Sequence, residues 1–376
     1  GRPKGVEIPH RGLVSLVRWH QRAYEIGERD RATLIAGPAF DASVWELWPY
    51  LSWGASVHVA DEETRLSPSR LGRWLSEEGI TVAFLPTALA ELLLKLEGLE
   101  DLSLRVLLTG GDKLHALGER ELPFRVVNHY GPTECSVVAT CGEVESGESD
   151  PSIGRGIDHT RVYVLDRHQN LVPMGVPGEL FIGGEGVARG YLGRPDLTAE
   201  RFVPDGYGDK PGARLYRTGD LVRYGNDGQL EFLGRIDQQV KIRGFRIELG
   251  EVETALLRHP EVKDAVVVAR EDGPGGKRLV AYVVHDAPLA DPQDLAAFLR
   301  ERLPDHMVPS AFVSLASLPL NTSGKVDRKA LPPPDLTPSE GLRSFVGPRT
   351  PTEEVVAGIW REVLQRERVG VQDNFF

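Results

Sequence analysis

The sequence predicts an α/β protein: a large domain built on a mainly parallel sheet, followed by a smaller α+β domain. Short apolar runs alternate with helical patterns through the first two hundred residues, which is typical of strands joined by covering helices. Helical patterns become sparse between residues 161 and 232, and the composition changes again after residue 236. A chain of 376 residues is long enough for more than one hydrophobic core.

Four apolar runs bounded by Gly, Pro or Asp predict the strands of the parallel sheet. They are Ala55–Ala60, Thr81–Leu85, Arg105–Thr109 and Arg125–Asn128. Between them, Pro68–Glu78 and Thr87–Leu96 carry apolar residues at helical spacing and predict helices. The next runs are separated by Gly-rich turns and predict an antiparallel, barrel-like part. They are Arg161–Leu165, Gly178–Ile182 and Leu230–Leu233.

The segment after residue 236 predicts its own α+β unit, with helices near 249–258 and 292–302 and strands at 264–269 and 278–284. A Pro-rich stretch predicts a linker, and Thr352–Gln365 predicts an amphipathic helix with Thr352 as its N-cap. The expected domain boundaries are therefore 1–236, 237–331, 332–348 and 349–376.

The composition excludes several classes of protein. A net charge of −11 disfavours a nucleic-acid-binding protein, and no apolar run reaches the ~20 residues of a membrane span. The sequence shows no signal peptide, and Cys135 and Cys141 suit a reducing compartment, so we expect a cytoplasmic location. The chain begins inside a motif at Gly1 and stops without a cap after Phe376, which predicts a piece of a longer protein.

Four motifs with nucleotide chemistry follow one another along the chain. They are Tyr130–Glu134, Tyr216–Leu221, Gly234–Asp237 running into Lys241–Gly244, and Asn321–Arg328. Thr133 offers a hydroxyl to phosphate, and Glu134 offers an oxygen ligand that suits Mg²⁺. Asp220 suits ribose hydroxyls, and Lys325 suits an oxyanion. Taken singly, each motif has an ordinary alternative: a turn, a salt bridge between strand ends, or a solvated lysine.

With these motifs in this order, the chain resembles the adenylation domain of a nonribosomal peptide synthetase. That superfamily includes acyl-CoA synthetases and firefly luciferase, and the matching stretches extend through nearly the whole chain. The resemblance implies the C-terminal part of a large adenylate-forming domain, with layered sheets, helices and a small β-barrel. It also implies a small α+β C-terminal domain and a truncated helical carrier domain that lacks the carrier serine.

The resemblance implies a ligase that forms aminoacyl-AMP from ATP·Mg²⁺ and then acylates the thiol of 4′-phosphopantetheine on the carrier. Lys325, Thr133 and Glu134 would be catalytic, Glu134 would hold the metal, and Asp237 would be the hinge between two catalytic states. Gly244 would line the pantetheine tunnel. The implied nucleotide-binding residues are Lys4, Gly110, Tyr130, Gly131, Thr133, Tyr216, Asp220 and Arg235.

The resemblance also implies the amino-acid pocket, with Asp41 paired to the substrate's ammonium group. Its residues would be Asp41, Ala42, Trp45, Phe84, Leu108, Gly110, His129, Val137 and Val138, with Lys325. This mainly apolar set is close to the pattern associated with leucine, although His129 stands where that pattern usually has asparagine. Valine and isoleucine differ from leucine by about one methylene, worth ~1–3 kcal/mol in such a pocket.

The expected partners are the carrier domain, neighbouring condensation domains and a small helper protein, with no nucleic acid and no membrane. Two alternatives remain: an acyl- or aryl-CoA ligase of the same fold, which Asp41 disfavours, and a non-catalytic module that docks a carrier. We expect the chain to be inactive on its own.

Overall fold

The computed structural model describes residues 4–115, 118–208, 210–236, 239–242, 245–270, 277–285, 292–319, 326–334, 347–364 and 369–371. Its backbone contacts divide the chain into two compact units, Gly1–Gly244 and Phe245–Phe376. The four-part division expected from the sequence stays a prediction. Lys325, Asp237 and Gly244 lie outside the described residues.

The first unit contains a sheet whose described strands have the order β2-β1-β3-β4-β5-β6-β7. The bounds are β1 Arg31–Leu34, β2 Ser56–Val59, β3 Val82–Pro86, β4 Val106–Gly110, β5 Arg125–Tyr130, β6 Thr140–Glu143 and β7 Arg155–Gly156. Strands β1 to β5 are parallel, whereas β6 and β7 join antiparallel. The parallel sheet expected from the apolar runs is therefore confirmed.

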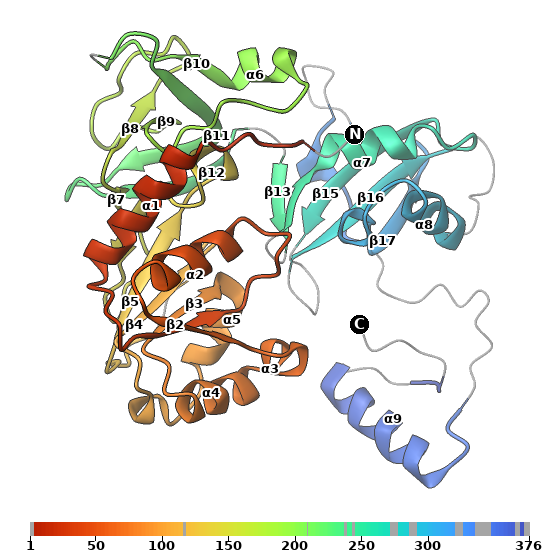
Figure 1. Ribbon diagram of the computed structural model, residues 1–376. Helices are drawn as coiled ribbons and strands as arrows, with labels where there is room; N and C mark the ends of the chain where they lie inside the picture. Colours follow the sequence, from red (N-terminus) through yellow and green to blue (C-terminus); the bar gives the residue numbers. More distant parts are fainter. Residues whose placement is uncertain are drawn as a thin grey trace. The chain divides into compact units, whose positions relative to one another are not determined.

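Helices cover both faces of this sheet (Figure 1). They are α1 His10–Ala23, α2 Ala42–Leu51, α3 Glu62–Leu66, α4 Pro68–Glu77 and α5 Thr87–Leu94. Alternate residues of β3 face opposite ways, so Val82 and Phe84 pack in a core with α1 and α2, while Ala83 and Leu85 pack in a core with α4 and α5. The site discussed below lies on the α1–α2 side.

A second sheet of the first unit is antiparallel, as expected from its Gly-separated runs. Its strands pair in the order β10-β11-β9-β8, and β12 also pairs with β11. The bounds are β8 Thr160–Leu165, β9 Gly178–Gly184, β10 Phe202–Pro204, β11 Arg214–Tyr224 and β12 Leu230–Arg235, with α6 at Pro195–Arg201. Strand β11 pairs with β12 and places Asp220 opposite Arg235, next to a register shift between Leu221 and Val222. The short strand β13 spans Gln239–Ile242.

The second unit is α+β, with described strands in the order β15-β16-β17. Its elements are β14 Phe245–Glu248, α7 Leu249–Leu256, β15 Asp264–Arg270, β16 Arg278–Val284, α8 Pro292–Arg300, β17 Ala311–Leu315 and α9 Pro351–Leu364. None of the helices in the described ranges is long and apolar enough to cross a membrane.

The expected N-cap of α9 was wrong by two residues. The Thr350 hydroxyl, rather than that of Thr352, accepts the N–H of Glu353 at 3.2 Å. The Glu353 carboxylate in turn accepts the Thr350 N–H at 3.0 Å, which completes a capping box. Pro351 lies between them at the first helical position, where its missing N–H breaks no hydrogen bond within the helix.

Candidate active site

The motif Tyr130–Glu134 begins at the last residue of β5, at the end of the parallel sheet where α/β proteins bind ligands. Two glycines allow backbone segments to meet there. A Cβ on Gly131 would lie 2.2 Å from the carbonyl oxygen of Val137, and one on Gly110 would lie 2.5 Å from that of His129. Both distances are far inside van der Waals contact, so these positions need glycine.

Asp41 and Thr133 meet although they are 92 residues apart in the sequence. Asp41 is the N-cap residue of α2, but its side chain makes no capping hydrogen bond. Instead, its Oδ2 accepts a hydrogen bond from Thr133 Oγ1 at 2.5 Å. The residue expected to bind an ammonium group and the residue expected to contact phosphate therefore lie side by side.

Glu134 is 5% exposed and is held by a residue that the sequence analysis missed. The Tyr191 hydroxyl donates to Glu134 Oε1 at 2.7 Å, and the backbone of Tyr191 pairs with Val6. This pairing also places the exposed Lys4 near the start of the same segment. A tyrosine in a Gly-rich stretch gives no local signal of this role, because the contact spans 57 residues.

Tyr130, Asp220 and Arg235 form one buried cluster. Arg235 donates to Asp220 Oδ1 at 2.6 Å, and the Tyr130 hydroxyl donates to Oδ2 of the same carboxylate. Burial, together with this carboxylate, raises the pKa of Tyr130 well above its usual range, so the phenol remains a donor. The salt bridge between strand ends that the sequence offered as an alternative is present, and it joins the residues expected at ribose and adenine.

Tyr216 occupies a different environment from the other expected nucleotide ligands. Its side chain is fully buried, and its ring packs 5.2 Å from that of Phe202 in the core of the second sheet. Its burial gives Tyr216 a packing role in this sheet, and its expected contact with the nucleotide stays a prediction.

Most residues of the expected amino-acid pocket belong to one apolar cluster on the α1–α2 side of the sheet. The buried members are Trp45, Phe84, Leu108 and Val138, and the partly buried members that pack on them are Ala42 and Val137. Val137 has φ of 73°, a costly conformation for a β-branched residue and one that is frequent at functional sites.

His129 joins this cluster, with its ring 4.9 Å from that of Trp45 and only 4% of its surface exposed. Its Nε2 lies 2.6 Å from the Tyr24 hydroxyl, and its Nδ1 lies 3.2 Å from the carbonyl oxygen of Thr109. Burial lowers the pKa of His129 to about 4, so the ring is neutral at physiological pH.

Comparison with known proteins decides the family. The AMP-binding enzyme family matches residues 1–192, and the AMP-binding enzyme C-terminal domain matches residues 251–325. The chain belongs to the AMP-binding enzyme family. By class it is an adenylate-forming ligase, as the motifs led us to expect.

The relatives of this AMP-binding enzyme are peptide synthetases. It is 57% identical over 383 residues to a linear gramicidin synthase protein of Brevibacillus parabrevis, covering 100% of this chain and 5% of that protein. It is 49% identical to surfactin synthase subunit 2 of Bacillus subtilis (strain 168), again over 100% of this chain but 10% of the relative. The chain thus spans a small part of the relatives that it matches.

Solved structures agree with the sequence relatives. One is holo-PA1221, an NRPS protein containing adenylation and PCP domains, with TM-score 0.76, 32% identity, and coverage of 98% of this chain and 62% of that one. Another is holo-AB3403, a four-domain nonribosomal peptide synthetase bound to AMP and glycine, with TM-score 0.58 and 36% identity. It covers 100% of this chain and 28% of that chain.

Glu134 and Thr133 of this AMP-binding enzyme offer oxygen donors of the kind that suits Mg²⁺. In the described ranges, no group of three or more His, Cys, Asp or Glu side chains could hold a metal ion. Mg²⁺ is typically bound by one or two carboxylates together with substrate phosphates. A single buried Glu134 beside Thr133 matches that pattern.

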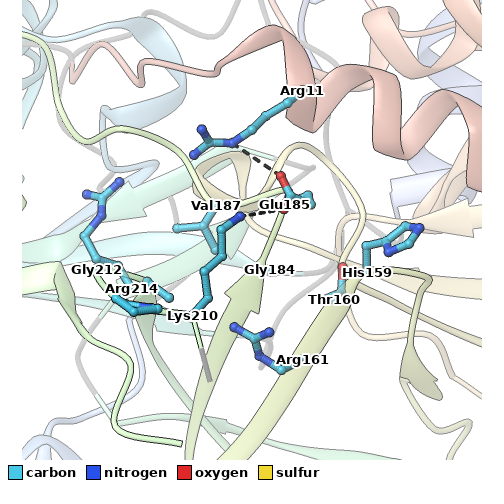
Figure 2. A pocket seen from close by; sticks show the side chains of 12 residues that line it. Arg11, His159, Thr160, Arg161, Gly184, Glu185, Val187, Lys210, Gly212 and Arg214 are labelled. Carbon is cyan, nitrogen blue, oxygen red and sulfur yellow. Dashed lines mark hydrogen bonds and ion pairs between the residues drawn. The ribbon is translucent and has the colours of Figure 1, made fainter. Parts of the chain in front are cut away.

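A cavity of about 550 Å³ lies elsewhere in the first unit, along β8 and β9 (Figure 2). Its cations already have protein partners. Glu185 lies between Arg11 and Lys210, at 3.5 Å and 3.2 Å, and Arg161 pairs with Asp205 at 2.7 Å. None of the expected site residues lines this cavity.

Proposed function

We propose that this chain activates an aliphatic amino acid, most simply leucine, as its aminoacyl adenylate. The aminoacyl group then passes to the phosphopantetheine thiol of a carrier domain within a longer peptide synthetase. The observation that carries the proposal is the Asp41–Thr133 hydrogen bond, because it brings together the carboxylate that would bind the ammonium group and the hydroxyl that would contact phosphate. The peptide synthetase relatives support the same reaction.

In this mechanism the Asp41 carboxylate pairs with the ammonium group of the amino acid and so directs its carboxylate toward the α-phosphate of ATP. The substrate carboxylate oxygen attacks phosphorus, and pyrophosphate leaves. Thr133 donates its hydroxyl to a phosphate oxygen and Lys325 neutralises the developing charge. Catalysis is thus mainly positioning and electrostatic stabilisation.

The nucleotide would lie across the end of the first sheet. Asp220 and Arg235 would bind the ribose hydroxyls, and Tyr130 would pack on adenine. The buried cluster that these three residues form holds them in one place before ATP arrives. Glu134 would hold Mg²⁺, which when bound screens the charge of the triphosphate.

The preference for an aliphatic side chain rests on the pocket wall. Trp45, Phe84 and Leu108 are 2%, 7% and 0% exposed, and they offer an apolar surface to a substrate. Leucine, valine and isoleucine differ there by about one methylene, worth ~1–3 kcal/mol, so discrimination among them would be moderate.

Within a peptide synthetase, neighbouring condensation domains would join the activated aminoacyl group to the growing peptide, and a small helper protein would assist folding or activity. The proposed location is the cytoplasm. Asp237 would serve as the hinge that exchanges the adenylating and thioester-forming states, with Gly244 in the pantetheine tunnel.

The test is amino-acid-dependent ATP–pyrophosphate exchange by the intact module, measured across the proteinogenic amino acids. We expect a maximum at leucine, with weaker exchange for valine and isoleucine. Asp41→Ala should reduce exchange by at least a hundredfold, because a buried ammonium group loses its counter-ion. Lys325→Ala should have a similar effect on kcat, while circular dichroism shows an intact fold.

Two results would reject the proposal. Activation of carboxylic acids that lack an ammonium group, in preference to amino acids, would indicate an acyl- or aryl-CoA ligase. A folded module that binds ATP but activates no carboxylate would indicate a carrier-docking module without catalysis.

A further inference from the structure

Two pocket residues with polar rings, Trp45 and His129, are both hydrogen-bonded to the end of α1. Trp45 Nε1 donates to His20 Nδ1 at 2.9 Å, and His129 Nε2 lies 2.6 Å from the hydroxyl of Tyr24, the C-cap residue of α1. All four side chains are at most 5% exposed. Nothing in the motifs pointed to His20 or Tyr24.

The tautomer of His129 follows from its two partners. The carbonyl oxygen of Thr109 can only accept, so Nδ1 carries the proton. Because the ring is neutral, Nε2 carries none, and it accepts the hydroxyl proton of Tyr24. Burial raises the pKa of Tyr24 well above its usual range, so this hydroxyl stays protonated.

The same logic applies to Trp45. An indole N–H can only donate, so the single polar atom of Trp45 donates its proton to Nδ1 of His20. The neutral His20 ring therefore carries its own proton on Nε2. Both polar rings thus have their hydrogen-bonding atoms engaged by protein groups. A substrate side chain beside them would meet carbon surface.

We propose that Tyr24 is a positioning residue for side-chain selection: its hydroxyl locks His129 in one orientation, so that a polar residue serves as an apolar pocket wall. This inference rests on the proposed function, since it concerns the amino acid that the pocket selects. His20 holds Trp45 in the same way. An unlocked imidazole could turn and offer a nitrogen to a polar substrate of similar size, such as asparagine.

The hydrogen bond can be tested without catalysis. Selective ¹⁵N labelling of histidine, with the His129 signals assigned by their loss in His129→Leu, reports which ring nitrogen is protonated. We expect a protonated Nδ1 and an unprotonated Nε2 in the wild type, and a changed Nε2 signal in Tyr24→Phe. A protonated Nε2 in the wild type would overturn the inference.

The consequence for selection is tested by pyrophosphate exchange in the intact module. Tyr24→Phe removes one oxygen atom and should lower the leucine-to-asparagine ratio of kcat/KM by about tenfold. The reason is that His129 Nε2 is then a buried acceptor without its donor, and a polar substrate side chain can hydrogen-bond to it. In the His129→Leu background, the same replacement should leave the ratio unchanged. Tyr224→Phe is the matched control, since its hydroxyl bonds the Val162 carbonyl at 3.1 Å in the second sheet.

The outcomes separate this inference from the function on which it rests. A Tyr24→Phe variant that is less stable but keeps the wild-type ratio would show a structural role only and would overturn the positioning role. If the wild type activates no amino acid, the proposed function fails and the selection role fails with it. The histidine signals would still decide whether Tyr24 locks His129.

Discussion

Replacing His129 tests the claim that a neutral histidine is buried at the centre of the pocket wall. Burial lowers the pKa of His129 from 6.5 to about 4, so the unfolded chain binds a proton more readily than the folded chain as the pH falls. The resulting contribution of His129 to the free energy of unfolding is fully present above pH ~6.5 and is lost as the pH falls toward ~4. Its full size is about 3 kcal/mol, of which about 2 kcal/mol is lost between pH 7.5 and pH 5.

His129→Asn removes this titration, so we expect the variant to lose about 2 kcal/mol less stability than the wild type over the same pH range. His20 is present in both proteins, and its own titration largely cancels in the comparison. The assay is urea unfolding at the two pH values, followed by tryptophan fluorescence. Among the six tryptophans, Trp360 alone belongs to the second unit, so the signal reports mainly on the first.

The matched control is His10→Asn, because His10 is exposed at the start of α1, away from the buried cluster. It should keep the wild-type pH dependence. If His129→Asn also keeps it, the buried neutral imidazole described here is wrong. A variant whose stability falls equally at both pH values would likewise show that His129 matters for packing but not through its proton.

Three further predictions concern glycine packing, a buried carboxylate in an ion pair and the nucleotide site. Gly131→Ala should cost about 1–3 kcal/mol of stability and most of the exchange activity, since its Cβ would meet a backbone oxygen at 2.2 Å. Gly206→Ala, with nothing within 4 Å, should change neither quantity, and equal effects in urea unfolding would contradict the packing argument. Asp205→Asn should cost about 2–3 kcal/mol, because its fully buried carboxylate pairs with Arg161; an unchanged urea midpoint would contradict this. Asp220→Asn should raise the KM for ATP about tenfold but leave that for the amino acid unchanged, whereas equal changes in both would indicate a purely structural ion pair.

Much of the fold could be predicted from the sequence because it depends on short-range patterns. The apolar runs at 81–85 and 105–109 became β3 and β4, each shifted by one residue, and the helical spacing at 87–96 became α5. The cap of α9 was missed although a local signal was present: Thr350 is followed by Pro351 and, three residues on, by Glu353, whereas Thr352 has Val355 at that spacing. The order of the motifs led to the correct family.

The sequence by itself determined the elements, the parallel sheet and the residue types of the candidate site. The tertiary structure alone decided which of those residues touch one another. Thr133 meets Asp41 across 92 residues, and Tyr24 meets His129 across 105, because α1 and α2 pack on the same face of the sheet. Hydrogen-bond partners at such separations depend on the packing of whole elements, which no local pattern encodes. The same holds for His129, the polar member of a mainly apolar set of expected pocket residues. Only its hydrogen-bond partners in the tertiary structure show that both ring nitrogens are engaged, so that the ring can serve as an apolar wall.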